Sequence, residues 1–251
     1  MLGVILAAGR GRRLAHITNH VPKALVKLLD GFSLLDLVMS SMRAAGVEEF
    51  VVVVGYKGHM IVEALDGAED VIVVRNPEYW RENGLSLLTA RDVVGSEDFV
   101  LVMSDHMVGP ELIRRAIEAG PLGLCVDRRP RFLLDPEEAT KVRIGPGGDI
   151  VAIGKGLRTW DAYDTGVFAC NELMFWAAEE LVKRKASITI SDCVRFLISR
   201  GIPFRAIDAT GLPWMDVDTH ECLEHARRTV LPELLRALGV GRPCAPRIHV
   251  A

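Results

Sequence analysis

Four continuous apolar runs, separated by helical patterns, recur in the first half of the chain. They lie at residues 4–6, 50–54, 71–74 and 99–103. After the first run, the segment from Ser33 to Ala45 carries apolar side chains at helical spacing and stops at Gly46. Because strands buried on both faces have continuous apolar sequences, this alternation predicts a parallel sheet with helices on both faces.

The second half predicts a mixed extension of that sheet. A Gly-Pro-Gly-Gly-Asp segment at 145–149 separates two short strand patterns, as is typical of a hairpin. We therefore expect an α/β fold, a Rossmann-like three-layer sandwich with a mostly parallel mixed sheet. The further elements expected are strands at 165–169 and 202–207, helices at 173–182 and 190–199, and a helix after Thr219 that Pro232 restarts or kinks.

Composition indicates a globular protein of one domain. The 251 residues are 49% apolar and show no repeat or linker, so we expect a single domain over 1–240 and a tail over 241–251. Five cysteines without paired spacing favour a reduced, cytoplasmic protein. We also expect no membrane span and no signal peptide, because no apolar run is long enough and the N-terminus has no basic lead-in.

A loop of small residues follows the first apolar run. Ala7, Ala8, Gly9 and Gly11 leave backbone N–H groups open to a ligand. No acidic residue occurs between positions 9 and 27, which carry a charge of +5 in a chain of net charge −3. Since this positive charge is confined to one loop, it predicts a polyphosphate ligand and not nucleic acid. The basic residues are Arg10, Arg12, Arg13, Lys23 and Lys27.

Two familiar glycine-rich motifs do not match this loop. The dinucleotide-binding fingerprint requires a third glycine where Leu14 stands, and the loop does not open a helix at once. The P-loop requires Gly-Lys followed by Ser or Thr, and the chain contains no such triplet.

Three aspartates follow apolar segments far along the chain from this loop. Asp105 comes after the run at 99–103, and Asp216 and Asp218 share one side of any extended segment. Carboxylates beside a phosphate site suit Mg²⁺, so these three are the candidate metal ligands, with Asp218 preferred over Asp216. The alternatives are that Asp105 serves a turn or a cap and that Asp218 caps the next helix.

The loop and its surroundings carry a family resemblance. Leu-Ala-Ala-Gly-x-Gly-x-Arg-Leu at 6–14, followed by Pro22-Lys23, resembles the signature of nucleotidyltransferases that activate sugar and alcohol phosphates. The resemblance covers residues 2 to 230 and implies the nucleotide-diphospho-sugar transferase type of fold. It implies that Asp105 and the segment 214–219 hold the metal. It also implies a nucleotide site made of Leu6, Ala7, Ala8, Gly9, Gly11, Asn83, Gly84 and Ser86.

The same resemblance implies an acceptor site. Lys155 matches the lysine that binds the acceptor phosphate, Lys141 is a second candidate, and Asp164, Thr165 and Gly166 match a turn that borders the acceptor.

Segments 83–87, 104–106, 138–142 and 164–166 resemble one branch in particular, the CTP:inositol-1-phosphate cytidylyltransferases. Gly154 stands where the sugar-nucleotide branch more often has an acid. Fused members continue into a membrane domain, and we expect this chain to be stand-alone.

The activity that the resemblance implies is Mg²⁺-dependent transfer of CMP from CTP to inositol 1-phosphate. An acceptor phosphate, with a second pKa near ~6, needs no base, so Arg13, Lys23 and Asp105 are the expected catalytic residues. The alternatives are a phosphocholine cytidylyltransferase, a sugar-1-phosphate nucleotidyltransferase using another NTP, and a non-catalytic nucleotide sensor. His106 stays open between substrate contact and packing, and the apolar helices leave room for a homodimer.

Overall fold

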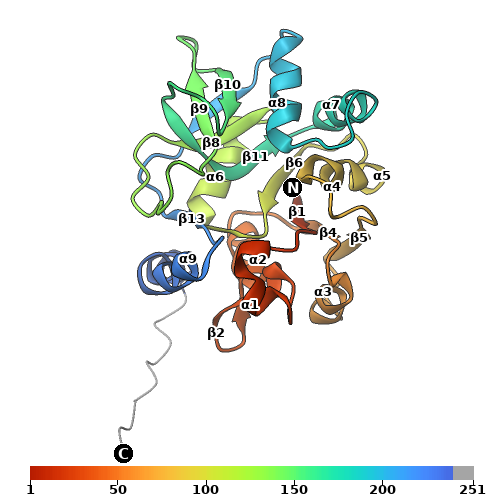
Figure 1. Cartoon of the computed structure of the whole chain (residues 1–251), viewed down its shortest axis with the longest axis vertical. Helices are drawn as coiled ribbons and strands as arrows, with labels where there is room; N and C mark the ends of the chain where they lie inside the picture. The colour runs from red at the N-terminus through yellow and green to blue at the C-terminus, as the bar shows by residue number, and fades with distance from the viewer. Residues whose placement is uncertain (240–251) are drawn as a thin grey trace, which may run out of the picture.

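Four parallel strands form the half of the central sheet that carries the amino-terminal signature. In the computed structural model, which describes residues 1–239, they stand in the order β6, β1, β4, β5 (Figure 1). Their bounds are β1 Leu2–Ala7, β4 Glu49–Val54, β5 Val71–Arg75 and β6 Phe99–Met103. These are the four predicted apolar runs. Their carboxyl ends meet at one edge, where ligands of such sheets bind.

Antiparallel pairing extends the sheet beyond β6. Strand β11 (Ala162–Cys170) lies antiparallel to β6, and β9 (Lys141–Ile144) and β10 (Ile150–Gly154) form the predicted hairpin beside it. On a separate branch, β8 (Gly123–Asp127) pairs with β11 and, in parallel, with β12 (Arg205–Asp208). The predicted mixed, mostly parallel α/β sheet is therefore confirmed.

Helices cover both faces of the sheet. One face packs on α2 (Leu34–Ala44), α3 (Gly58–Ala64) and α6 (Pro110–Ala119), with Ile5 and Val52 of the strands pointing that way. The other face packs on α4 (Asn83–Thr89), α7 (Glu172–Val182) and α8 (Ile190–Ser199), and α5 (Arg91–Val94) follows α4. Because neighbours along a strand point to opposite faces, every residue of β1 is buried.

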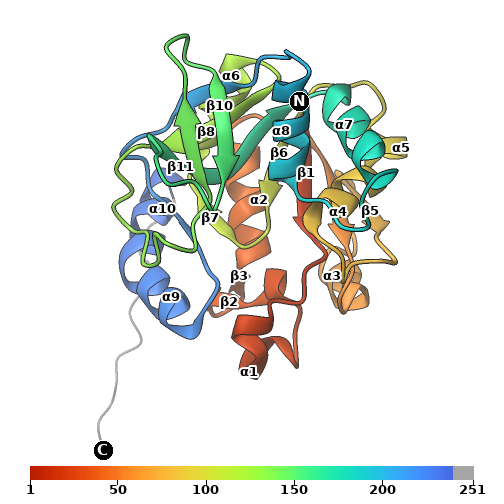
Figure 2. The ribbon, with the colours of Figure 1, turned by 45° about the horizontal axis from the view of Figure 1, so that its top comes forward.

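A third apolar cluster joins the two ends of the described chain. Helix α9 (His220–His225) continues through a π-helical turn (Ala226–Val230) into α10 (Leu231–Ala237), and these segments pack on Leu14 and on α2. Figures 1 and 2 show α9 at the same end of the molecule as α1 (Ala15–Thr18). Pro232 lies in the first turn of α10, where the missing N–H costs little. The signature loop is thereby held against the C-terminal helices.

Short elements complete the fold near the strand ends. Two 3₁₀ turns (Arg12–Leu14 and Lys23–Leu25) flank α1, and a small ladder joins β2 (Lys27–Leu29) to β3 (Phe32–Ser33). An antiparallel pair, β7 (His106–Val108) and β13 (Trp214–Asp216), was not anticipated. It places Asp216 opposite His106 and so carries the late acidic segment to the end of β6.

Two expectations about the ends of the chain have different outcomes. The predicted tail, 241–251, lies outside the described residues, so the domain boundary stays a prediction. Within residues 1–239, no helix combines the length and the apolar character needed to cross a membrane.

Candidate active site

Gly11 shapes the signature loop around Lys23. Its φ of +64° lies in the left-handed region that favours glycine, and a Cβ there would lie 3.0 Å from Cδ of Lys23. The Thr18 hydroxyl donates to the Gly11 carbonyl at 3.0 Å, which ties the loop to α1. The small residue therefore leaves a passage along which the Lys23 side chain reaches the end of β6.

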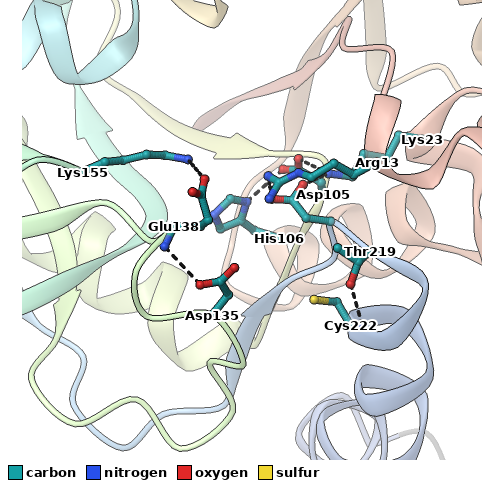
Figure 3. Close-up of polar contacts among 10 residues, drawn as sticks. Arg13, Lys23, Asp105, His106, Asp135, Glu138, Lys155, Thr219 and Cys222 are labelled. Atoms are coloured by element: carbon teal, nitrogen blue, oxygen red, sulfur yellow. Dashed lines mark hydrogen bonds and ion pairs between the residues drawn. The ribbon is translucent and has the colours of Figure 1, made fainter.

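Lys23 joins two acidic segments that are far apart in the chain. Its buried Nζ lies 2.6 Å from Oδ2 of Asp105 and 2.5 Å from Oδ1 of Asp218, and Arg13 pairs with the other oxygen of Asp218. Figure 3 shows Arg13, Lys23 and Asp105 close together. Burial alone would lower the pKa of Lys23, but the charges of Asp105 and Asp218 outweigh it and raise the pKa. The basic loop and the two acidic segments therefore meet at one place in the fold.

His106 extends this charged group into the cleft. Its Nδ1 lies 2.9 Å from Oδ1 of Asp105. Burial would lower the pKa of His106, but the bond to Asp105 and nearby carboxylates raise it to about 9, so the imidazole is charged at neutral pH. Burial opposes ionisation of Asp105 as well, yet the Lys23 charge and the His106 bond hold the pKa of that carboxyl below its ordinary value. His106, left open by the sequence, belongs to the site.

The two late aspartates have different surroundings. Asp218 forms ion pairs with Lys23 and Arg13. The pKa of Asp216, in contrast, is raised by burial and by the negative charges of Asp218 and Asp105. The side chain that caps α9 is that of Thr219, which accepts from the Cys222 N–H at 3.1 Å. The alternative that Asp218 caps this helix is therefore wrong, and Asp218 is the late aspartate that shares the Lys23 ammonium with Asp105.

A cavity of about 270 Å³ opens beside Lys23 and Asp105. Asn83 reaches its wall from α4, where its Oδ1 accepts from the backbone N–H of Ile190 at 3.0 Å, and the Ser86 hydroxyl accepts from Asn76 at 3.0 Å. The Asn83 bond holds the start of α4 against the start of α8, and the Ser86 bond holds α4 against the segment that follows β5. The predicted nucleotide residues that line this cavity are Leu6, Ala8, Gly9, Asn83 and Ser86.

The other predicted nucleotide residues, Ala7, Gly11 and Gly84, do not line this cavity. Ala7 faces the opposite side of the sheet, toward α2, and Gly11 shapes the loop described above. Gly84 allows a close backbone approach, since its N–H donates to the Ile188 carbonyl at 2.9 Å and a Cβ would meet that oxygen at 2.8 Å.

A second cavity, of about 170 Å³, adjoins the first through Asn83, Met103 and His106. Gly166 packs against His106 so closely that a Cβ, at a φ of +78°, would lie 2.3 Å from the ring Cδ2. Burial raises the pKa of Asp164 to about 6, while its Oδ1 accepts from the Gly166 N–H at 2.7 Å. The predicted acceptor residues Lys155, Asp164 and Gly166 line this cavity.

Two predicted acceptor residues are not brought to this cavity. Thr165 is fully buried and donates to the Cys125 carbonyl at 2.8 Å, so it fastens β11 to β8. Lys141 is buried against the Trp160 ring, with its Nζ 4.8 Å from the ring centroid and 3.2 Å from Glu137.

Glu138 lines this cavity, and the sequence marked its segment, 138–142, without assigning Glu138 a role in the site. Its Oε2 lies 3.4 Å from Nζ of Lys155. In Figure 3, Glu138 and Lys155 lie on one side of His106, and Arg13 and Lys23 lie on the other.

The structure also bears on the expected metal. Among residues 1–239 there is no group of three or more His, Cys, Asp or Glu side chains placed to hold a metal ion. The Lys23 ammonium lies between the carboxylates of Asp105 and Asp218.

Residues 3–242 match the MobA-like NTP transferase domain. The chain belongs to this family. It is 36% identical over 242 residues to a bifunctional IPC transferase and DIPP synthase of Aquifex aeolicus, covering 95% of this chain and 54% of that protein. A protein of the same description from Rubrobacter xylanophilus is 38% identical, with 90% and 51% covered. The chain thus spans about half the length of these relatives.

Solved structures agree with the family assignment. The inositol-1-phosphate CTP transferase from T. maritima superposes with a TM-score of 0.82 at 28% identity, covering 97% of this chain and 98% of that one. A UDP-glucose pyrophosphorylase at 16% identity and TM-score 0.76 shows the shared fold, with 92% and 98% covered. The predicted family and the predicted fold type are confirmed.

Proposed function

We propose that this chain transfers CMP from CTP to inositol 1-phosphate, giving CDP-inositol and pyrophosphate. The observation that carries the proposal is the cluster of Arg13, Lys23, Asp105 and Asp218 where two adjoining cavities meet. The nucleotide would occupy the cavity beside Gly9 and the acceptor the cavity beside Lys155. The names of the relatives, IPC transferase and inositol-1-phosphate CTP transferase, support this choice of substrates.

The reaction needs alignment and charge neutralisation more than proton transfer. An oxygen of the acceptor phosphate, already ionised at neutral pH, forms a bond to the α-phosphorus of CTP. The bond from that phosphorus to the bridging oxygen breaks, and pyrophosphate leaves with the electron pair. Arg13 and Lys23 would neutralise the charge that develops on the α-phosphate and on pyrophosphate. Lys155 would release its ion-pair partner Glu138 and bind the acceptor phosphate in its place.

Magnesium fits the donor set of this cluster. Asp105 and Asp218 direct carboxylate oxygens to one point, now occupied by the Lys23 ammonium, and Mg²⁺ prefers such hard oxygen ligands. We propose these two aspartates, with Asp216 nearby, as the side chains that hold it. When bound, Mg²⁺ would supply further neutralisation of the nucleotide phosphates. A cytoplasmic location and a homodimer stay predictions.

A substrate panel tests the proposal. CTP, UTP, ATP and GTP are each incubated with inositol 1-phosphate, phosphocholine, 2-aminoethylphosphonate and glucose 1-phosphate, and products are identified by mass spectrometry. We expect CDP-inositol to dominate and EDTA to abolish it. If a different coupled product dominated, the named substrates would be wrong, but the chain would still be a nucleotidyltransferase.

Substitution of Asp105 distinguishes an enzyme from a nucleotide sensor. Asp105→Asn should lower pyrophosphate release about 100-fold or more, while exposed Asp98→Asn should not change it. Equal, negligible pyrophosphate release by wild type and Asp105→Asn would contradict catalysis and favour the sensor.

A further inference from the structure

Two exposed histidines from distant parts of the chain meet beside the candidate active site. Nε2 of His16, in α1, lies 3.4 Å from Nδ1 of His220, the first residue of α9, across 204 positions of sequence. The ring centroids are 5.1 Å apart and the ring planes are inclined by 76°. Both side chains are open to solvent ions. Neither residue has a role in the proposed transfer reaction.

The spacing of the two ring nitrogens matches a shared metal ion better than a direct hydrogen bond. Two Zn–N bonds of about 2.0–2.1 Å at a tetrahedral angle place the nitrogens about 3.3–3.4 Å apart. A ring N–H that donates directly favours a shorter separation, about 2.9–3.0 Å. We propose that His16 and His220 form a two-histidine site for zinc or a similar borderline divalent cation, with water completing the coordination.

This site and the carboxylate cluster would select different cations. Imidazole nitrogen suits zinc, copper and nickel, whereas carboxylate oxygen suits magnesium. Within residues 1–239, no third His, Cys, Asp or Glu side chain completes a metal-binding group with these two histidines. The site is therefore open and should bind more weakly and reversibly than a closed zinc site with four protein ligands.

Its position gives the site a consequence for the cleft. His16 follows Arg13 by three residues and His220 follows Asp218 by two, and Arg13 pairs with Asp218. A metal that joins the two rings would hold α1 against α9 and keep this ion pair closed. If Arg13 must leave Asp218 to contact the nucleotide, zinc binding should slow turnover. This effect on turnover rests on the proposed function.

Calorimetric titration with zinc chloride tests the site directly. The full chain is titrated in excess Mg²⁺, so that the carboxylate cluster does not compete for zinc. We expect one zinc per chain, an affinity weakened by roughly tenfold or more in His16→Gln and in His220→Gln, and no binding in the double variant. Zinc should also raise the Tm of the wild type and leave that of the double variant unchanged, because a ligand that binds the folded state stabilises it.

Two control variants make the assignment specific. His20→Gln removes the histidine four residues after His16, the spacing that would pair them on a regular helix, and His59→Gln removes an exposed histidine of α3. Both should bind zinc like the wild type. No zinc binding by the wild type, unchanged affinity in His220→Gln, or loss of binding in His20→Gln would each overturn the site. These readouts do not depend on whether CDP-inositol is formed.

Discussion

Lys23 holds two carboxylates of the candidate active site through a single ammonium group. Lys23→Met keeps an unbranched side chain one atom shorter and removes its charge, so Asp105 and Asp218 lose their shared partner. If the same cation also meets the nucleotide phosphates, kcat should fall about 100-fold, which corresponds to ~3 kcal/mol of transition-state stabilisation. Steady-state rates of pyrophosphate release give this value. Exposed Lys27→Met is the control and should keep wild-type rates. A kcat for Lys23→Met close to that of wild type would contradict the assigned role.

Gly166 tests the contact between the acceptor turn and His106. Gly166→Ala places a methyl group 2.3 Å from the His106 ring at a φ of +78°, so the ring must move. Gly148→Ala is the matched control, since its φ is +85° and nothing lies within 4 Å of the added Cβ. Urea titration should give about 1–2 kcal/mol of destabilisation from backbone strain in both variants, and about 1–3 kcal/mol more in Gly166→Ala. KM for the acceptor should rise only in Gly166→Ala, and equal effects of the two variants would argue against the contact.

Site residues could be predicted from the sequence where a local pattern determines their placement. Small residues and uninterrupted positive charge marked the loop that carries Arg13 and Lys23, and Asp105 was marked by its place just after the apolar strand β6. The direction in which the Thr165 side chain points could not be predicted from such a local pattern. The pairing of β11 with β8 is irregular between Asp164 and Phe168, so simple alternation fails where the acceptor turn lies.

Helix α8 begins at a capping box that also supports the acceptor cavity. Thr189 Oγ1 accepts from the Asp192 N–H at 3.1 Å, Asp192 accepts from the Thr189 N–H at 2.8 Å, and Ile190 lines the cavity. Partial burial alone would raise the pKa of Asp192, but bonds from Lys185, Thr189 and Arg195 lower it to about 2. Since the folded pKa lies below the ordinary 3.8, the stabilisation is present above pH 3.8 and is lost as pH falls toward 2.

Asp192→Asn should therefore lower the free energy of unfolding by about 1 kcal/mol at pH 7. It should also flatten the loss of stability between pH 4 and pH 2, where Asp192 of the wild type takes up its proton. Urea titrations at several pH values measure both effects, with exposed Asp66→Asn as the control. If Asp192→Asn keeps the wild-type pH dependence, the capping box does not account for the acid sensitivity of this element.

Helices and strands could be predicted where a single segment carried a regular pattern over enough residues. The helix from Ile190 to Ser199 has the predicted bounds, and the hairpin of β9 and β10 follows its glycine-rich turn. Strand β8 was missed because Gly123–Asp127 is short and starts at glycine, and it is a strand only because β11 and β12 pair with it. The pair of β7 and β13 joins segments that are about 110 residues apart, which local patterns cannot reveal.

At the scale of the whole molecule, one sheet separates two apolar cores, and buried cysteines report on each. Cys125 lies in the core beside α6, and Cys170 and Cys193 lie in the core beside α7 and α8. Burial raises the pKa of Cys125 and of Cys193 to about 12 and also raises that of Cys170, so all three thiols are protonated and poorly reactive in the folded state. Because both cores share the strands β1, β4 and β6, we expect them to open together.

Thiol labelling in a Cys222→Ser and Cys244→Ser background tests this expectation. In buffer, Ellman's reagent should react with the three remaining thiols at least about 10³-fold more slowly than with an unfolded chain, as for groups exposed only by global unfolding. Two further variants retain the thiol of one core alone, Cys125 in the first and Cys170 with Cys193 in the second. Their labelling should rise with urea along one curve that coincides with the loss of circular dichroism. If Cys125 became reactive at a lower urea concentration than Cys170 and Cys193, the face covered by α2, α3 and α6 would open by itself, and the shared strands would not couple the two cores.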